Sequence, residues 1–288
     1  MSQSDFKSLE WPFKDPKFIF FTDFDGTITL QDSNDYMTDT IGFGQEIREG
    51  LNRDILDGKI TFRDAFRQMM DSVKKPFPEC VEYLVKNIKL DPGFNEYYQW
   101  ALKNQIPTVI VSSGMQPIIR AVLKNLVGDD ADKLTIVCNE PEARPGKKFE
   151  EEGGWQIKYH DDSGFGHDKS LTLRPYANLP ADKRPTLFYA GDGVSDLSAA
   201  RETDLLFAKK GRGTYLFVSD SEQHVLTTAD LIKYCAREEV PFTVFEDWSS
   251  ILATVQEIVA GKKSVQQAAD EGYKAYKQGG AGVNGAAK

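Results

Sequence analysis

Short, predominantly apolar runs recur along the chain, and most of them end close to acidic, hydroxyl-bearing or glycine residues. The first run comprises residues 18–21 and leads through Thr22 to Asp23. A strand that carries no polar residue on either side must be buried on both faces, which is typical of parallel sheets covered by helices. Because helical patterns separate most of the runs, the sequence predicts an α/β fold built on a doubly wound parallel sheet. Five further runs are similar, although four of them include a threonine, at residues 107–111, 134–138, 186–190, 205–208 and 242–245.

One connection between these runs is too long to be a simple crossover. More than eighty residues separate Asp23 from Pro107, and a loop of that length without structure is uncommon. Thr61, followed by Asp64 three residues later, is typical of a helix N-cap with an acidic first turn. We therefore expect a small helical domain inserted after the first strand, with helices at residues 32–41, 44–56, 61–73, 78–87 and 95–103.

The remaining segments complete the predicted domain organisation. Residues 139–166 resemble a β-hairpin or a ragged loop, in which residues 155–159 form one strand. The Gly/Ala-rich end of the chain has no apolar face to bury, so it is expected to be mobile. The predicted division is a sheet domain at residues 1–31 and 105–262, an inserted helical domain at 32–104, and a marginal helix with a mobile tail at 263–288.

Charge and cysteine content exclude several classes of protein. The chain has 35 Lys and Arg against 44 Asp and Glu, a formal net charge of −9, so a nucleic-acid partner is not expected. No apolar run approaches the roughly 18 residues that a membrane span requires, and the first residues lack the pattern of a secretory signal. Cys80, Cys138 and Cys235 are odd in number and widely spaced. They predict buried thiols in a reducing cytoplasm, not a disulfide framework or a zinc site.

Chemically distinctive residues follow the predicted strands. In an open parallel sheet, ligands bind at the carboxyl ends of the strands, so these residues are expected to converge on one edge. Several carboxylates at one place repel one another unless a cation holds them together. Oxygen ligands without nearby His or Cys favour Mg²⁺, whereas a lysine beside glycine-rich turns favours a phosphate. The residues concerned are Asp23, Asp25, Ser112, Ser113, Gly114, Lys169, Asp192 and Asp196.

The segment Asp23-Phe24-Asp25 suggests how such a site would work. If the first strand continues through it, Asp23 and Asp25 point to the same side and Phe24 points to the other. One carboxylate can then attack phosphorus while the second gives and takes a proton. Gly26 would let the chain turn sharply after them. The sequence therefore indicates a phosphoryl-transfer site.

These residues carry a resemblance to a known family. DFDGTIT at residues 23–29, SSG at 112–114, Lys169 and GDGVSD at 191–196 resemble, in order, the four motifs of the haloacid dehalogenase (HAD) phosphatase superfamily. The chain is most similar to its phosphoserine-phosphatase-like branch, and within it to fungal phosphatases of sugar and polyol phosphates. The resemblance implies a Rossmann-like catalytic core with an inserted helical cap.

The resemblance also implies roles for the two aspartates and their neighbours. Asp23 would be the nucleophile, forming an aspartyl-phosphate, and also a Mg²⁺ ligand. Asp25 would protonate the leaving alcohol and then activate water, and its carbonyl oxygen would contact the metal. Ser112 would bind a phosphate oxygen with help from the backbone amides of Ser113 and Gly114.

Three further residues would complete the site that the resemblance implies. Lys169 would offset the negative charge of nucleophile and phosphate, although a solvated loop lysine is an equal alternative on sequence alone. Asp192 would complete the metal site. Asp196 would either be a further metal ligand or hold Lys169 in place.

Substrate choice would fall to the inserted helices, which imply a small phosphorylated metabolite. Asp32 stands where phosphoserine phosphatases have a glutamate, but Met70 stands near the place of the arginine that grips the substrate carboxylate. Arg63 or Arg67 could replace that arginine, although two arginines four residues apart are more typical of a solvated helix face. Asp32 and Asn34 could instead exchange hydrogen bonds with the hydroxyls of a polyol.

The expected function is therefore Mg²⁺-dependent hydrolysis of a small polyol or sugar phosphate. Alternatives are a phosphoserine phosphatase, a methionine-salvage phosphatase of the same branch, or a non-catalytic regulatory protein on the same fold. Tyr97, Tyr98 and Trp100 are expected to pack a helix, and His167 is expected to make a structural hydrogen bond. The sequence does not define an oligomeric state.

Overall fold

The computed structural model describes residues 9, 13–210 and 228–281, which form two compact units. The first unit contains the described parts of residues 1–23, 91–109 and 169–288. The second contains residues 24–90 and 110–168. The boundaries predicted for the inserted domain, at residues 32 and 104, come from the sequence pattern, whereas the two units are defined by contacts between residues. The predicted boundaries therefore stay a prediction.

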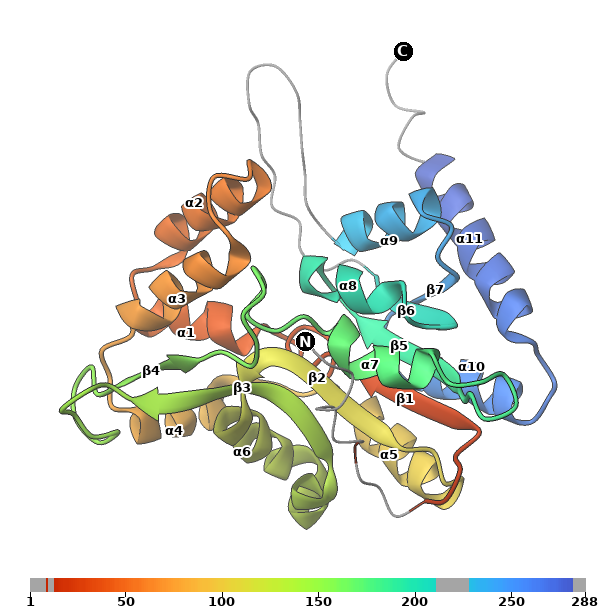
Figure 1. Cartoon of the computed structure of the whole chain (residues 1–288), viewed down its shortest axis with the longest axis horizontal. Helices are drawn as coiled ribbons and strands as arrows, with labels where there is room; N and C mark the ends of the chain where they lie inside the picture. Colours follow the sequence, from red (N-terminus) through yellow and green to blue (C-terminus); the bar gives the residue numbers. More distant parts are fainter. Residues whose placement is uncertain (1–8, 10–12, 211–227, 282–288) are drawn as a thin grey trace. The chain divides into compact units, whose positions relative to one another are not determined.

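The first unit is built on parallel strands that pair in register (Figure 1). Strand β1 (Phe18–Thr22) pairs with β5 (Thr186–Gly191), from Phe18 opposite Thr186 to Thr22 opposite Ala190. Strand β5 pairs in turn with β6 (Leu205–Lys209), and β6 with β7 (Phe242–Phe245). The helical segments of this unit are α5 (Gly93–Lys103), α7 (Ser170–Ala177), η2 (Val194–Asp196), α8 (Leu197–Ala200), α9 (Thr228–Arg237), α10 (Trp248–Val259) and α11 (Val265–Ala281).

Aromatic side chains fill the core of the first unit. Phe20 on β1 is completely buried, and its ring lies 4.9 Å from that of Tyr97 on α5 and 5.6 Å from that of Trp248 on α10. Tyr98 is also buried, and its ring stacks on that of Phe94. The predicted packing role of Tyr97 and Tyr98 is confirmed, because strands covered by helices require apolar side chains on both faces.

Helix α11 packs against β7. Ala268 and Ala269 are buried, and a Cβ on Gly272 would meet the carbonyl oxygen of Phe242 at 2.2 Å. The backbone of the helix therefore approaches the strand too closely for any residue but glycine at that position. The predicted mobile tail falls partly on residues 282–288, which lie outside the described residues.

The second unit combines helices with an antiparallel hairpin (Figure 1). Strand β3 (Thr135–Ala143) pairs with β4 (Trp155–Lys158), from Glu140 opposite Lys158 to Ala143 opposite Trp155. The hairpin predicted between residues 139 and 166 is thus confirmed. The helices of this unit are α1 (Ser33–Ile41), α2 (Gln45–Leu56), α3 (Phe62–Ser72), α4 (Phe77–Asn87), α6 (Gln116–Val127) and the 3₁₀ helix η1 (Gly128–Lys133).

Strand β2 (Thr108–Met115) begins in the first unit and ends in the second. The strand order is β4-β3-β2-β1-β5-β6-β7. The α/β prediction is confirmed, and all six predicted strands are present in the described residues. The sheet is nevertheless mixed and not wholly parallel, because a hairpin turns β4 back along β3.

The helices of the long insertion begin where their capping residues predict. Asp32 accepts hydrogen bonds from the backbone amides of Asn34 and Asp35 and so caps α1. Thr61 accepts from the amide of Asp64 and caps α3, as predicted. Each satisfies an amide that has no partner within its helix. In the part of the chain that the structure describes, no helix is long and apolar enough to cross a membrane.

Candidate active site

The chain leaves the sheet at Asp23. Strand β1 ends at Thr22, and the amide of Asp23 donates to the carbonyl of Ala190 at 2.8 Å. The next residues form a turn, in which the amides of Ile28 and Thr29 both donate to the carbonyl of Phe24 and Gly26 has a positive φ of 74°. The strand does not continue to Asp25, so the condition under which Asp23 and Asp25 would point to the same side is not met.

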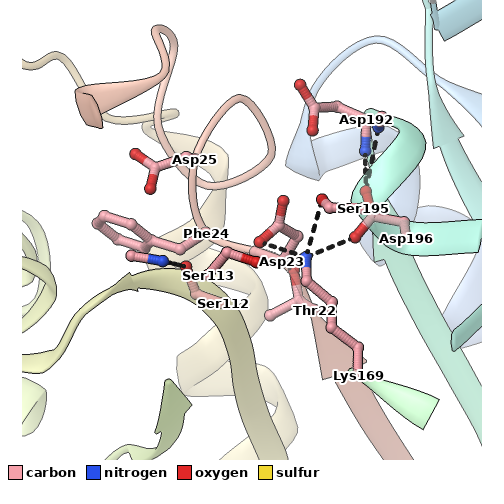
Figure 2. A network of polar contacts seen from close by, with 12 residues as sticks. Thr22, Asp23, Phe24, Asp25, Ser112, Ser113, Lys169, Asp192, Ser195 and Asp196 are labelled. Carbon is pink, nitrogen blue, oxygen red and sulfur yellow. Dashed lines mark hydrogen bonds and ion pairs between the residues drawn. The ribbon is translucent and has the colours of Figure 1, made fainter. Parts of the chain in front are cut away.

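Lys169 is the centre of the polar cluster in the first unit (Figure 2). Its Nζ atom lies 2.9 Å from Oδ1 of Asp23 and 2.7 Å from Oδ1 of Asp196, and its side chain is completely buried. Burial alone would lower the pKa of Lys169. The charges of Asp196 and Asp23 outweigh that effect, so the pKa lies above its ordinary value. Lys169 is therefore a buried cation between two carboxylates and not a solvated loop lysine.

Asp196 is fixed by donors on both of its oxygens. Its Oδ1 accepts from the Tyr189 hydroxyl at 2.6 Å, and its Oδ2 accepts from the amides of Asp192 and Gly193 at 2.9 and 3.0 Å (Figure 2 shows the amide contacts). Burial, and then the charge of Asp196, raise the pKa of Tyr189 well above its ordinary value, so the hydroxyl remains a donor. A Cβ on Gly191 would lie 2.5 Å from the Asp196 carboxylate. Asp196 was predicted either to be a further metal ligand or to hold Lys169 in place, and the geometry favours the second role.

The same cluster has the composition of a metal site. Carboxylate oxygens of Asp23, Asp192 and Asp196 lie within 4.8 Å of one another. Asp23 and Asp196 are buried, whereas Asp192 is partly exposed. Oxygen donors at this spacing fit a hard divalent cation. Because both oxygens of Asp196 already accept hydrogen bonds, Asp23 and Asp192 are the better suited ligands.

Asp25 belongs to a second group of residues, in the second unit. Its side chain is 5% exposed. The Ser33 amide donates to its Oδ1 at 2.7 Å, and the Asn34 side chain donates to its Oδ2 at 2.9 Å. A Cβ on Gly114 would lie 3.1 Å from Oδ2. Two residues at the start of α1 therefore hold the Asp25 carboxylate.

The predicted phosphate-binding residues lie within β2, in the same unit. Ser112 is buried, and its Oγ accepts a hydrogen bond from the amide of Gly114 at 3.0 Å (Figure 2). The carbonyl of Ser113 accepts from the Asn139 side chain at 2.7 Å. His167 is buried, and its Nδ1 lies 2.7 Å from the carbonyl oxygen of Ser112. The predicted structural hydrogen bond of His167 is confirmed, and it fixes the strand that carries Ser112.

The predicted specificity residues have different surroundings. Asp32 caps α1 through Oδ1, and Met70 is 1% exposed among apolar neighbours of α3. The Arg63 guanidinium donates to the carbonyl of Asp161 at 2.5 Å and lies 4.5 Å from the centre of the Tyr159 ring. Arg67 lies 5.2 Å from the centre of the same ring. Both arginines therefore interact with the segment that follows β4.

Sequence reasoning missed two residues that organise these groups. Arg48 on α2 is 2% exposed and forms ion pairs with Asp39 at 2.7 Å and Asp35 at 2.9 Å. An arginine on an amphipathic helix is ordinarily solvated, so only the tertiary structure reveals this pairing. Tyr189 stands inside an apolar strand run, where its hydroxyl gave no signal. Its position two residues before the GDGVSD segment was the available clue.

Comparison with known proteins agrees with this geometry. Residues 20–201 match the model of the haloacid dehalogenase-like hydrolase family. The chain is 50% identical over 239 residues to Pdp3-interacting factor 1 of Schizosaccharomyces pombe, covering 83% of this chain and 94% of the relative. It is 45% identical over 258 residues to a polyol phosphate phosphatase of Saccharomyces cerevisiae, covering 87% and 98%.

A solved structure extends the comparison to the fold. A phospho-aspartyl intermediate analogue of phosphoserine phosphatase superposes with a TM-score of 0.56 at 17% identity, covering 84% of this chain and 99% of that one. The chain therefore belongs to the haloacid dehalogenase-like hydrolase family. Within that family it is an enzyme of the phosphatase class.

Proposed function

We propose that the protein hydrolyses the phosphate monoester of a small polyol or sugar, with Mg²⁺, through an aspartyl-phosphate on Asp23. The observation that carries the proposal is the buried Lys169 between Asp23 and Asp196, at 2.9 and 2.7 Å. A buried lysine paired in this way costs several kcal/mol of desolvation. Its position is well explained if it offsets the charge of a nucleophile and of an incoming phosphate.

In the first step, an Asp23 oxygen attacks phosphorus while the bond between phosphorus and the alcohol oxygen breaks. The departing oxygen takes a proton from Asp25, so the alcohol leaves neutral. Lys169 stabilises the negative charge on the transferring phosphoryl group. Ser112 supports the phosphate through its hydroxyl, with the amides of Ser113 and Gly114 as the proposed additional donors.

In the second step, water attacks the phosphorus of the aspartyl-phosphate. Asp25 accepts a proton from that water, the bond between phosphorus and the Asp23 oxygen breaks, and inorganic phosphate leaves. Both aspartates return to their starting states. Only Phe24 separates them in the chain, so the nucleophile and the proton donor are covalently linked parts of one short segment.

The carboxylate cluster fits Mg²⁺ as the cofactor. Asp23 and Asp192 would hold it, with the Asp25 carbonyl as the further ligand that the family implies. When bound, Mg²⁺ would neutralise phosphate charge and orient the phosphorus atom for attack by Asp23. The three buried, unpaired cysteines support a reducing cytoplasm as the compartment in which the enzyme acts.

The residues of the second unit favour a polyol or sugar phosphate over phosphoserine. Met70 is apolar and buried, and the guanidinium of Arg63 already contacts a carbonyl and an aromatic ring. A substrate carboxylate beside Met70 would therefore meet an apolar side chain, and the Arg63 guanidinium is already engaged. Leaving it unpaired would cost several kcal/mol. The similarity to a polyol phosphate phosphatase supports the same substrate class.

A single assay tests the proposal. We expect inorganic phosphate release from three- to six-carbon polyol and sugar phosphates to have a higher kcat/KM than release from phosphoserine. If phosphoserine is the best substrate, the assignment of Met70 is wrong and Arg63 or Arg67 becomes the candidate carboxylate partner. A methionine-salvage phosphate is measured beside them as the alternative from the same branch. A purified protein that hydrolyses none of these esters would instead support a non-catalytic role.

A further inference from the structure

Asn34 occupies an unusual position in the first turn of α1. Its side chain is 4% exposed. The side-chain Nδ2 donates to Oδ2 of Asp25 at 2.9 Å, and the preceding residue, Ser33, donates its amide to Oδ1 at 2.7 Å. These contacts lie within the second unit. Asn34 is therefore a direct partner of the proposed proton donor.

The orientation of the Asn34 amide follows from its surroundings. Once Asp25 has given up its proton, its carboxylate only accepts hydrogen bonds, so the nitrogen end of the Asn34 amide must face it, as it does in the structure. Asp32 imposes the same choice. Burial raises the pKa of Asp32, and hydrogen bonds from the Asp35 and Asn34 amides, the charge of Arg48 and the Asn34 side chain oppose that rise. Rotating the amide by a half turn would bring its oxygen against a carboxyl oxygen of Asp25.

The other end of the amide is a buried acceptor. Among the residues that the structure describes, none donates a hydrogen bond to Oδ1 of Asn34, although this atom is removed from solvent. Buried polar atoms without a partner are rare in native proteins, because the lost hydration is not replaced. A donor on a ligand would satisfy this atom.

We infer that Oδ1 of Asn34 accepts a hydrogen bond from a hydroxyl of the substrate, while Nδ2 of the same side chain holds the Asp25 carboxyl group in position. This inference rests on the proposed phosphatase function and adds to it the residue that would recognise the alcohol. The substrate would be a phosphate ester with a hydroxyl on a carbon close to the ester oxygen. One side chain would then link recognition of the alcohol to the placement of the group that protonates it, since hydrogen bonds in a chain strengthen one another.

The test compares three substrates that differ in the presence of a hydroxyl beside the ester carbon or in the need to protonate the leaving group. Glycerol 1-phosphate has a hydroxyl beside the ester carbon, and propyl phosphate lacks every hydroxyl. In p-nitrophenyl phosphate the leaving phenolate needs little protonation. The variant is Asn34→Leu, which keeps the size of the side chain without its hydrogen bonds, with Asn34→Ala as a second variant should the first not fold.

Thr38→Val is the matched control. Thr38 lies one turn further along α1, is buried, and donates its hydroxyl to the backbone carbonyl of Asn34 at 2.8 Å. The control thus removes a buried hydrogen bond from the same helix without removing the partner of Asp25. We expect its kinetic constants on all three substrates to stay close to those of the unmodified enzyme.

For Asn34→Leu we expect kcat on glycerol 1-phosphate to fall by about 10- to 100-fold, part of the 10²- to 10⁴-fold that proton transfer contributes. On p-nitrophenyl phosphate the fall should not exceed about threefold, because general-acid catalysis contributes little there. The preference in kcat/KM for glycerol 1-phosphate over propyl phosphate should drop by about tenfold, the value of one hydrogen bond to a substrate hydroxyl.

Each other outcome has a definite meaning. Equal losses on all three substrates would show a merely structural role for Asn34 and overturn the inference. An unchanged preference for glycerol 1-phosphate over propyl phosphate would refute recognition of the hydroxyl by Oδ1. Failure of the unmodified enzyme to release phosphate from any of the three esters would instead refute the proposed function, which keeps the two failures distinguishable.

Discussion

Replacement of Lys169 by methionine should destabilise the first unit, because it removes the only cation that contacts both carboxylates in the described part of the cluster. Methionine matches the length of the lysine stem, so the change removes charge with little loss of packing volume. Asp23 and Asp196 would remain buried, 5% and 0% exposed, with no lysine between them. The variant therefore measures the value of the charge itself.

The expected loss in free energy of unfolding follows from the two ion-pair distances of Lys169. At an effective dielectric constant of about 20, each contact corresponds to about 6 kcal/mol of Coulomb attraction, at separations of 2.9 and 2.7 Å. Most of this attraction offsets the cost of burying the ammonium group. Breaking a buried ion pair from one side costs about 3–5 kcal/mol in measured cases. Asp196 keeps its Tyr189 hydroxyl and two amide donors, so we expect the lower end, about 3 kcal/mol.

The assay is urea unfolding at pH 7 of the unmodified protein, Lys169→Met, Asp196→Asn and the double variant. The pKa of Lys169 is raised above 10.5, so its contribution is fully present below that pH and is lost only as the pH rises through the higher value. The four free energies of unfolding give a coupling energy, which we expect to exceed about 1.5 kcal/mol. A coupling below about 0.5 kcal/mol would refute the reasoning, since it would mean that the contact is no stronger than a surface ion pair.

Three further predictions concern chemistry and reactivity. Asp23→Asn should abolish phosphate release, because an amide cannot attack phosphorus, whereas Asp25→Asn should slow it by about 10²- to 10⁴-fold; phosphate trapped on any residue other than Asp23 would contradict this. Stripping divalent cations with a chelator should remove activity and added Mg²⁺ should restore it, so full activity after stripping would exclude the metal assignment. Burial raises the pKa of Cys80 and of Cys235 to about 12, and also raises that of Cys138. At pH 8 a disulfide reagent should therefore label no thiol in the folded protein and three after denaturation, and rapid labelling of the native protein would refute it.

The sheet and the helices could be predicted because their signals are local. The apolar run before Asp23 indicates a strand buried on both faces, and the hydroxyl of Thr61 indicates where a helix begins. The predicted ends of the inserted helices agree with α1 to α5 within two residues. The antiparallel pairing of β4 was predictable only as a hairpin, because its register depends on contacts with β3 that no local pattern encodes.

The candidate site was predictable as a set of residue types but not as a geometry. The motif order indicated Asp23, Lys169 and Asp196, and the structure brings these three together. The direction of Asp25 was not predictable, because the turn after Asp23 depends on hydrogen bonds to the carbonyl of Phe24. The buried pairing of Arg48 could not be foreseen either, since burial of a charge depends on the packing of α1 against α2.

The start of α1 links the capping of a helix to the proposed chemistry. Asp32 caps the helix, and the next two residues hold the Asp25 carboxylate. Local opening of a helix end needs only part of the free energy of global unfolding. Heating would then release Asp25 while the sheet remains intact, so inactivation should precede the loss of the far-ultraviolet circular dichroism signal. Stabilising substitutions elsewhere in the chain would raise the melting temperature and leave the temperature at which activity is lost unchanged.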